Sequence, residues 1–144
     1  MPRRPTTKTN ARSEGDDEEL VRLADEVRAR AHSPYSRIQV GAALRARDGR
    51  VFTGCNVENA SYGLTLCAER SAIVKAVSEG AREFTAIAIT TSLERMMMPC
   101  GACRQVLAEF APTLRVIVVG HDGGRVETTL AKLLPDAFGP LDLS

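Results

Sequence analysis

The sequence contains no tryptophan, and only two tyrosines and four phenylalanines occur among its 144 residues. A protein that stacks many bases needs an aromatic platform, so this scarcity argues against a general binder of single-stranded nucleic acid. An excess of one charge is also missing, because 19 Lys and Arg face 18 Asp and Glu, for a formal net charge of +1. This balance supplies no long-range attraction to nucleic acid or to an anionic membrane.

Long apolar runs are absent too. None reaches the roughly 20 residues that a membrane-spanning helix needs, and the first residues lack the apolar core of a secretory signal. We therefore expect a soluble, cytoplasmic protein with no membrane and no nucleic-acid partner. With 44% hydrophobic and 26% charged residues, the composition suits one domain, which we place at residues 16–144. Residues 1–15 are polar, and we interpret them as a disordered N-terminal tail.

Helices and strands are expected to alternate along most of the chain. Asp16 or Asp17 can cap a first helix, and Pro34 stops it, because the residue before proline disfavours helical angles. Further elements follow from apolar spacing and turn residues: a hairpin at 40–47 and 51–55, helices at 66–78, 100–110 and 129–134, strands at 84–90 and 115–119, and an edge strand at 126–128. Helices between strands must cross the faces of a sheet. We predict an α/β fold, a three-layer α/β/α sandwich with a mixed five-stranded sheet.

Three of the four cysteines occur in two short motifs. Residues 67–70 read Cys-Ala-Glu-Arg, and residues 99–104 read Pro-Cys-Gly-Ala-Cys-Arg. Three thiolates can fill three positions of a tetrahedral zinc ion and leave the fourth for water. Glu69 would then lie beside the metal without binding it. This combination is typical of zinc nucleobase deaminases in their three-cysteine variant.

The chemistry of such a site gives roles to the neighbouring residues. Zinc lowers the pKa of bound water from about 15.7 towards 7, and a carboxylate such as Glu69 can carry protons between that water and a cytosine ring. Three thiolates and Zn²⁺ sum to −1, so Arg70 and Arg104 are candidates for donating hydrogen bonds to the sulfurs. The alternative is a closed structural zinc site with Cys55 as the fourth ligand, which would leave Glu69 without a purpose.

With these motifs in view, the sequence closely resembles the small, homotetrameric cytidine deaminases from about Leu20 to Leu143. Further segments carry the resemblance: Ser33-Pro34-Tyr35-Ser36, Val40-Gly41-Ala42-Ala43, Gly54-Cys55-Asn56-Val57-Glu58-Asn59-Ala60 and Leu133-Leu134-Pro135. It implies hydrolytic deamination of cytidine and 2′-deoxycytidine in pyrimidine salvage, with release of ammonia. It also implies one zinc per chain and a homotetramer with shared active sites.

The resemblance assigns the zinc ligands to Cys67, Cys100 and Cys103, the catalytic proton carrier to Glu69, and the moderation of thiolate charge to Arg70. It further assigns a set of substrate-binding residues: Asn56 and Glu58 at the ribose, together with Ala60, Ile38 and Phe138. The family aromatic at Phe138 reaches the active site of a neighbouring subunit.

One residue departs from the family pattern. Ile38 stands where the family usually has a phenylalanine that stacks on the pyrimidine, and it leaves room for a different cytosine-bearing small molecule, such as a nucleoside antibiotic. Two further alternatives are less favoured. A nucleic-acid editing domain would need a basic stripe, which the sequence lacks, and a catalytically silent zinc module would have no use for Glu69. The methionine-rich segment 95–98 before Pro99 is a candidate for a soft pocket wall.

Overall fold

A five-stranded sheet forms the centre of the computed structural model, which describes the backbone of residues 9–144 and the side chains of residues 15–144. Its strands are β1 (Val40–Ala46), β2 (Val51–Cys55), β3 (Phe84–Thr91), β4 (Arg115–Val119) and β5 (Arg125–Thr129). The α-helices are α1 (Thr9–Arg28), α2 (Ala68–Ser78), α3 (Gly101–Phe110) and α4 (Leu130–Leu133), and two short 3-10 helices are η1 (Tyr62–Leu64) and η2 (Pro140–Leu143).

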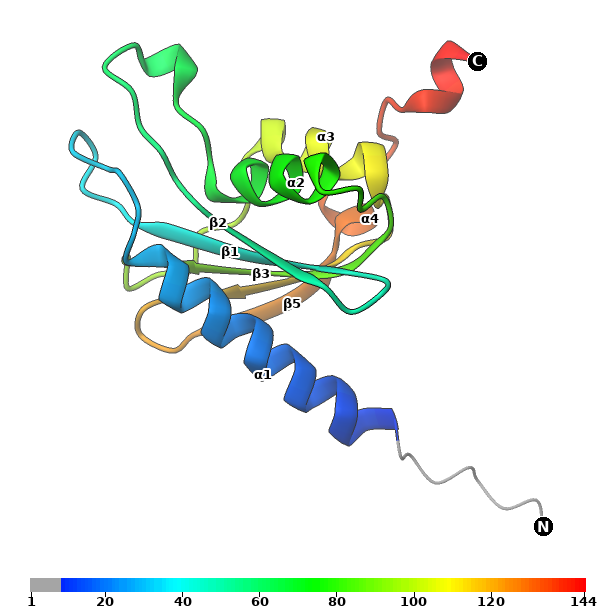
Figure 1. The fold of residues 1–144 in the computed structure, drawn as a ribbon, viewed down its shortest axis with the longest axis horizontal. Coiled ribbons are helices and arrows are strands. Elements are labelled where there is room, and N and C mark those ends of the chain that lie inside the picture. The colour runs from blue at the N-terminus through cyan, green and yellow to red at the C-terminus, as the bar shows by residue number, and fades with distance from the viewer. Residues whose placement is uncertain (1–8) are drawn as a thin grey trace.

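The strand order is β2-β1-β3-β4-β5, and β3 lies at the centre of the sheet (Figure 1). Strand β1 pairs antiparallel with both β2 and β3, and β5 pairs antiparallel with β4. Only β3 and β4 run parallel, and α3 makes the crossover that parallel strands require. The prediction of a mixed five-stranded sheet with a terminal edge strand is confirmed.

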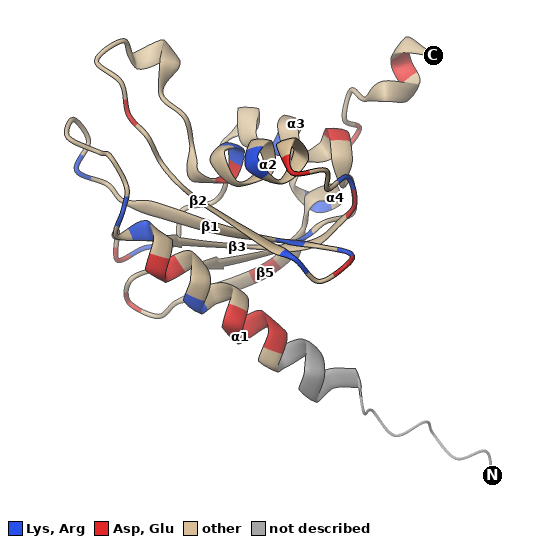
Figure 2. Ribbon diagram, viewed as in Figure 1, with Lys and Arg blue, Asp and Glu red and all other residues tan. Residues whose placement is uncertain are grey.

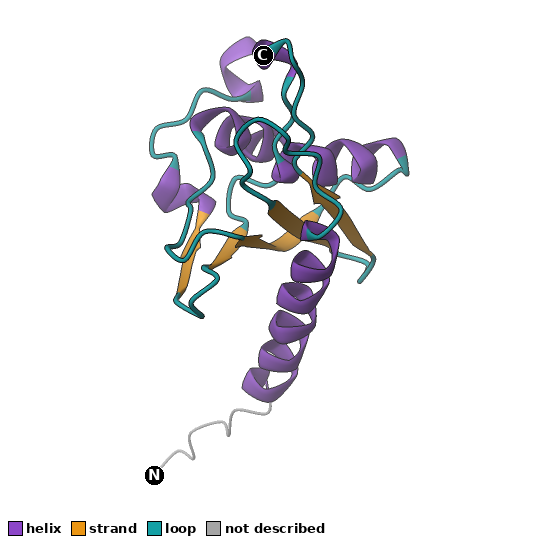
Figure 3. Ribbon diagram, turned by 90° about the vertical axis from the view of Figure 1, so that its left-hand side faces the viewer, coloured by secondary structure: helices purple, strands orange, loops and turns teal. Residues whose placement is uncertain are grey.

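Helices cover both faces of the sheet, so the predicted three-layer α/β/α architecture is also confirmed. Helix α1 lies against one face, while α2, α3 and α4 lie against the other (Figures 1 and 3). The central strand β3 is apolar on both faces because it contributes to both layers. Ala86 and Ala88 pack in the cluster under α1, whereas Ile87 and Ile89 pack in the larger cluster under α2 and α3.

A glycine on the hairpin lets the helix that carries the first cysteine motif approach the sheet closely. A Cβ added at Gly54 on β2 would lie 2.5 Å from the backbone nitrogen of Ala72 in α2. No side chain fits there without moving the helix backbone, so Gly54 sets how deeply α2 sits on the sheet.

The first helix begins earlier than the sequence predicts, and it ends at Arg28, before the predicted stop at Pro34. It begins at Thr9, so the predicted cap at Asp16 or Asp17 was wrong, and residues 9–15 are helical. Residues 1–8 of the predicted tail lie outside the described residues. Asp17 is instead buried in the helix, and its carboxylate accepts a hydrogen bond of 2.6 Å from Arg115 of β4. This ion pair across two layers gives the residue a tertiary role that local spacing does not reveal.

The last residues leave the body of the molecule. The segment that ends in η2 projects away from the layers (Figure 1), and Phe138, Leu141 and Leu143 are 59%, 88% and 81% exposed. Along the described part of α1, acidic residues outnumber basic ones, and the run Asp16–Glu19 forms the largest acidic stretch (Figure 2). Within residues 9–144, no helix is long and apolar enough to cross a membrane.

Candidate active site

Both cysteine motifs lie at helix N-termini, as expected from the sequence. Cys67 is the N-cap of α2 and Cys100 is the N-cap of α3, while Cys103 lies in the first turn of α3. Because α2 and α3 lie on the same face of the sheet, their N-termini bring the three sulfurs together. The Cys67 and Cys100 Sγ atoms are 3.9 Å apart, and those of Cys100 and Cys103 are 3.3 Å apart.

The three thiols fit a zinc ion. Their sulfur atoms all lie within 4.8 Å of one another, and tetrahedral Zn–S bonds of about 2.3 Å place two sulfurs about 3.8 Å apart. Among the described side chains, Cys55 at the end of β2 is not part of this group. The cluster therefore offers three ligands and an open fourth position, which does not support the closed four-cysteine alternative.

The electrostatics favour a thiolate at Cys67. A hydrogen bond with the Cys103 thiol and another from Arg70 lower the pKa of Cys67 to about 5, against the opposing effect of burial. Arg70 donates from one guanidinium nitrogen to the Cys67 sulfur over 3.3 Å, as expected. A ligand that is already deprotonated binds zinc without first releasing a proton.

The second candidate arginine does not reach a sulfur. Arg104 donates to the backbone carbonyl of Pro99 over 2.7 Å and to that of Leu133 over 2.8 Å. Pro99 directly precedes the ligand Cys100, and Leu133 ends α4. Arg104 therefore braces the backbone on which Cys100 sits, instead of moderating the charge of the thiolates.

Glu69 lies in the first turn of α2 and is 4% exposed. Burial raises the pKa of its carboxyl, because the ionised form is poorly solvated there. The side chain lines the same cavity as Cys67 and Cys100. A buried carboxyl beside an open metal position is suited to accept and return protons.

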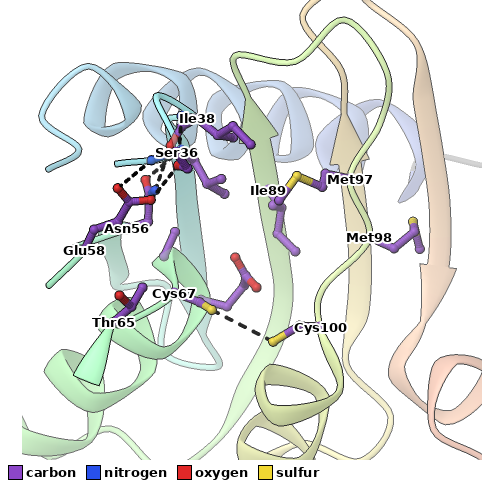
Figure 4. A pocket seen from close by; sticks show the side chains of 13 residues that line it. Ser36, Ile38, Asn56, Glu58, Thr65, Cys67, Ile89, Met97, Met98 and Cys100 are labelled. Carbon is purple, nitrogen blue, oxygen red and sulfur yellow. Dashed lines mark hydrogen bonds between the residues drawn. The ribbon is translucent and has the colours of Figure 1, made fainter. Parts of the chain in front are cut away.

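The cavity in front of the cysteines has a volume of about 270 Å³, and Figure 4 shows the side chains that line it. Its metal end is formed by Cys67, Glu69 and Cys100. The far end is polar, with Ser36, Asn56, Glu58 and Thr65. The walls between the two ends are apolar and comprise Ile38, Val40, Ala68, Ile89, Met97 and Met98. The cavity thus suits a flat apolar ring at the metal and hydroxyl groups at the far end.

Two of the predicted substrate-binding residues already make hydrogen bonds within the protein. The Asn56 side chain donates to the carbonyl of Ile38 and accepts from the backbone N–H of Val40, both over 2.8 Å. Glu58 accepts hydrogen bonds from the turn at Tyr35 and Ser36. The Ser36 hydroxyl, followed by these backbone N–H groups, holds the pKa of Glu58 below its usual value. Both residues line the cavity with part of their bonding capacity already used.

The structure does not bring every predicted residue to the cavity. Ala60 and Phe138 are both exposed and do not line it, and the Phe138 carbonyl accepts a hydrogen bond from the Gln105 side chain. Conversely, Thr65 and Ile89 line the cavity although sequence reasoning missed them. Nothing in the sequence separates Ile89 from the other apolar residues of its strand. The methionine-rich segment does form part of the wall, through Met97 and Met98.

A three-thiol cluster with an open position, beside a buried carboxyl in an α/β/α fold, defines a hydrolytic zinc centre. Residues 14–120 match the family described as the cytidine and deoxycytidylate deaminase zinc-binding region. The chain therefore belongs to this deaminase family.

Individual relatives agree with the family match. The chain is 49% identical over 130 residues to a cytidine deaminase of Sporosarcina psychrophila, covering 90% of this chain and 96% of the relative. It is 48% identical over 120 residues to a cytidine deaminase of Mycobacterium tuberculosis, covering 83% and 87% of the two chains. A crystal structure of cytidine deaminase from Burkholderia pseudomallei superposes with a TM-score of 0.81 at 49% identity, covering 84% of this chain and 98% of that one.

These comparisons confirm several expectations from the sequence. The resemblance to cytidine deaminases, the α/β fold, the assignment as a cytidine deaminase and hence a hydrolase, and the zinc cofactor are all shown.

Proposed function

We propose that this protein hydrolyses cytidine and 2′-deoxycytidine to uridine and 2′-deoxyuridine, with release of ammonia, as a step of pyrimidine salvage. The observation that carries the proposal is the shared cavity, in which the buried Glu69 lies beside the cysteine cluster and Asn56 and Glu58 lie at the opposite end. The relatives named as cytidine deaminases support the choice of substrate.

Cys67, Cys100 and Cys103 would hold one zinc ion per chain, and the bound ion would supply an activated water at neutral pH. Glu69 takes a proton from the attacking water and delivers it to N3 of the pyrimidine. The oxygen of that water bonds to C4, and Glu69 then takes the remaining proton of this oxygen and delivers it to the amine, which leaves C4 as ammonia. One carboxyl can serve both transfers because it lies in the cavity beside the cysteine cluster.

The rest of the cavity orients the nucleoside. Asn56 and Glu58 provide an amide and a carboxylate for sugar hydroxyls, and both retain unused hydrogen-bonding capacity. Ile38 covers one face of the base with an aliphatic surface. Ala60 belongs to the same loop as Glu58, and we assign it to the substrate-binding region as well.

We extend the proposal to the assembly, a homotetramer whose active sites are shared between subunits. Phe138 is 59% exposed and does not reach the cavity of its own chain. We therefore assign its side chain to the active site of a neighbouring subunit. Residues 16–144 would form the single catalytic domain of each subunit. We place the reaction in the cytoplasm, where free thiols such as these remain reduced.

The decisive experiment measures ammonia release by the zinc-loaded protein from cytidine, 2′-deoxycytidine and a cytosine-containing oligonucleotide. We expect turnover of both nucleosides and none of the oligonucleotide. Turnover of the oligonucleotide alone would indicate an editing enzyme. Zinc binding without any turnover would indicate a silent zinc module, and either result would overturn the proposal.

A further inference from the structure

We propose that Ser36 is a positioning residue that sets the affinity for the sugar, by holding Glu58 and Ile38 in one fixed relation. This role rests on the proposed function, in which Glu58 receives a sugar hydroxyl. Ser36 lines the cavity beside Glu58, and its hydroxyl and backbone N–H both donate to the Glu58 carboxylate (Figure 4).

The Ser36 hydroxyl makes two hydrogen bonds at once. It donates to the Glu58 Oε2 atom, and it accepts from the backbone N–H of Ile38 over 3.1 Å. One hydroxyl therefore connects the carboxylate at the polar end of the cavity to the residue that forms the apolar wall. No other described side chain bonds to both of these residues.

The turn that carries Ser36 is strained, and hydrogen bonds to other segments of the chain keep it in place. Arg37 has a φ of 63°, in the left-handed region that residues other than glycine rarely adopt. The segment before the turn is fixed to the Glu58 segment, because the His32 N–H donates to the Asn56 carbonyl and the Glu58 N–H donates to the His32 carbonyl. These backbone bonds and the Glu58 carboxylate hold the turn in its conformation. The conformation of the turn then directs Ile38 into the cavity.

The hydrogen bonds at Glu58 leave a defined place for a ligand. A carboxylate offers about four lone-pair sites. Oε1 accepts from the backbone N–H groups of Tyr35 and Ser36, at 3.0 and 3.1 Å, while among the described residues Oε2 accepts only from the Ser36 hydroxyl. One site on Oε2 therefore remains open, and the Ser36 hydroxyl decides which way it faces. Without that hydroxyl, Oε2 has no partner among the described residues and the Ile38 N–H loses its acceptor.

Substrate affinity should change more than turnover, because Ser36 contacts the sugar end of the cavity and not the cysteines or Glu69. Replacing Ser36 with Ala should raise the KM for cytidine about tenfold, a typical cost for losing a hydrogen bond to a charged group. The kcat should stay within about twofold. Ser36→Thr retains the hydroxyl and should restore KM to within about threefold of the unmodified enzyme.

A double-mutant cycle with Glu58→Ala tests whether Ser36 acts through the carboxylate. We expect Ser36→Ala to change KM by no more than about twofold once Glu58 is absent. Ser78→Ala is the matched control, because the Ser78 hydroxyl also donates to a neighbour, the Lys75 carbonyl, but lies at the end of α2 away from the cavity. Ser36→Cys keeps the volume but donates weakly, and it should raise KM in the same direction even if the alanine variant folds poorly.

An unchanged KM in Ser36→Ala or Ser36→Cys would overturn the inference, as would a tenfold effect that persists without Glu58 or a loss confined to kcat. These results are separate from failure of the proposed function, in which the unmodified enzyme itself would not turn over cytidine.

Discussion

Cys67 and Glu69 are only two residues apart, yet they face different environments because α2 begins between them. Cys67 is the N-cap and keeps its thiol half-buried, where Arg70 can reach the sulfur. Glu69 belongs to the first turn and is almost fully buried. The change from extended to helical backbone at this point therefore separates a thiol whose pKa is lowered from a carboxyl whose pKa is raised by burial.

The ligand assignment predicts that removing one thiol removes the metal. Cys100→Ala should lose zinc and activity together, because two remaining thiolates hold zinc poorly. Cys55→Ser is the control and should keep about one zinc per chain, since Cys55 is outside the cluster. Metal analysis of the purified proteins measures both. Full zinc occupancy in Cys100→Ala would refute the assignment, and zinc loss in Cys55→Ser would point to a four-cysteine site.

The role of Glu69 predicts a chemical defect without a structural one. Glu69→Gln keeps the shape of the side chain but cannot carry a proton, so kcat should fall by about 10⁴-fold or more. Zinc content and melting temperature should stay close to those of the unmodified protein. Near-normal kcat in this variant would remove Glu69 from the mechanism.

Ile38 predicts a gain in affinity when an aromatic ring replaces it. The residue is half-buried in the cavity wall, where a phenyl ring would add stacking on the base. Ile38→Phe should lower the KM for cytidine by up to about tenfold, equivalent to roughly 1.4 kcal/mol, with kcat little changed. Steady-state kinetics test this directly. A folded but inactive variant would show that the cavity is shaped around the smaller side chain, and a substrate bulkier than cytidine would then be preferred.

Among the elements, α3 connects the metal cluster to the C-terminal part of the chain. Cys100 and Cys103 lie at its N-terminus, and the adjacent Arg104 and Gln105 bond to the carbonyls of Leu133 and Phe138. The position of Cys100 thus depends on a helix that is itself fixed to α4 and to the segment beyond it. Arg104 is the central link, because it also holds the Pro99 carbonyl.

The brace predicts that Arg104 slows the loss of zinc. Arg104→Met should release zinc to a chelator about tenfold faster, since supporting contacts around metal ligands commonly change affinity by tenfold or more. Arg82→Met is the matched control, because Arg82 also donates to two carbonyls, those of Val77 and Ala81, at the far end of α2. Equal release rates in the two variants, at equal melting temperatures, would show that Arg104 contributes only to general stability.

At the scale of the whole molecule, the C-terminal segment extends away from the three layers (Figure 1). Three large apolar side chains of that segment remain more than half exposed, namely Phe138, Leu141 and Leu143. Apolar surface of this kind is stabilised when another chain covers it. The proposed tetramer supplies such a chain and brings Phe138 to a neighbouring cavity.

The shared site predicts that shortening the chain reduces activity through assembly. Deleting residues 138–144 should lower activity more than the change in melting temperature explains, because the neighbouring cavity loses Phe138. Deleting residues 140–144 is the control, since it removes η2 and keeps Phe138. Activity and sedimentation should be measured on the same samples. A fully active monomer would rule out shared sites.

The order of the elements and the identity of the metal cluster could be predicted from the sequence, because both depend on local patterns. Alternation and apolar runs predicted β2 and β4 to the residue, and the Thr129 hydroxyl accepts from the Lys132 N–H as a cap should. The cysteine motifs carry their ligand chemistry in their spacing, since a first-turn residue three positions after an N-cap faces the same way. The beginning of α1 could not be predicted from its polar residues. Asp17 was expected to cap the helix, but its carboxylate instead pairs with Arg115 on β4.

Tertiary structure alone decided which residues share the cavity with the cluster. The distance between the sulfurs of Cys67 and Cys100 follows from the packing of two helices on one face of a sheet, and Ile89 reaches the wall only because β3 lies at the centre. Glu58 was predicted from its motif, but its engagement with Ser36 depends on a strained turn 22 residues earlier. Local sequence encodes which chemical groups are available, whereas contacts between distant segments set their orientation, their burial and therefore their pKa.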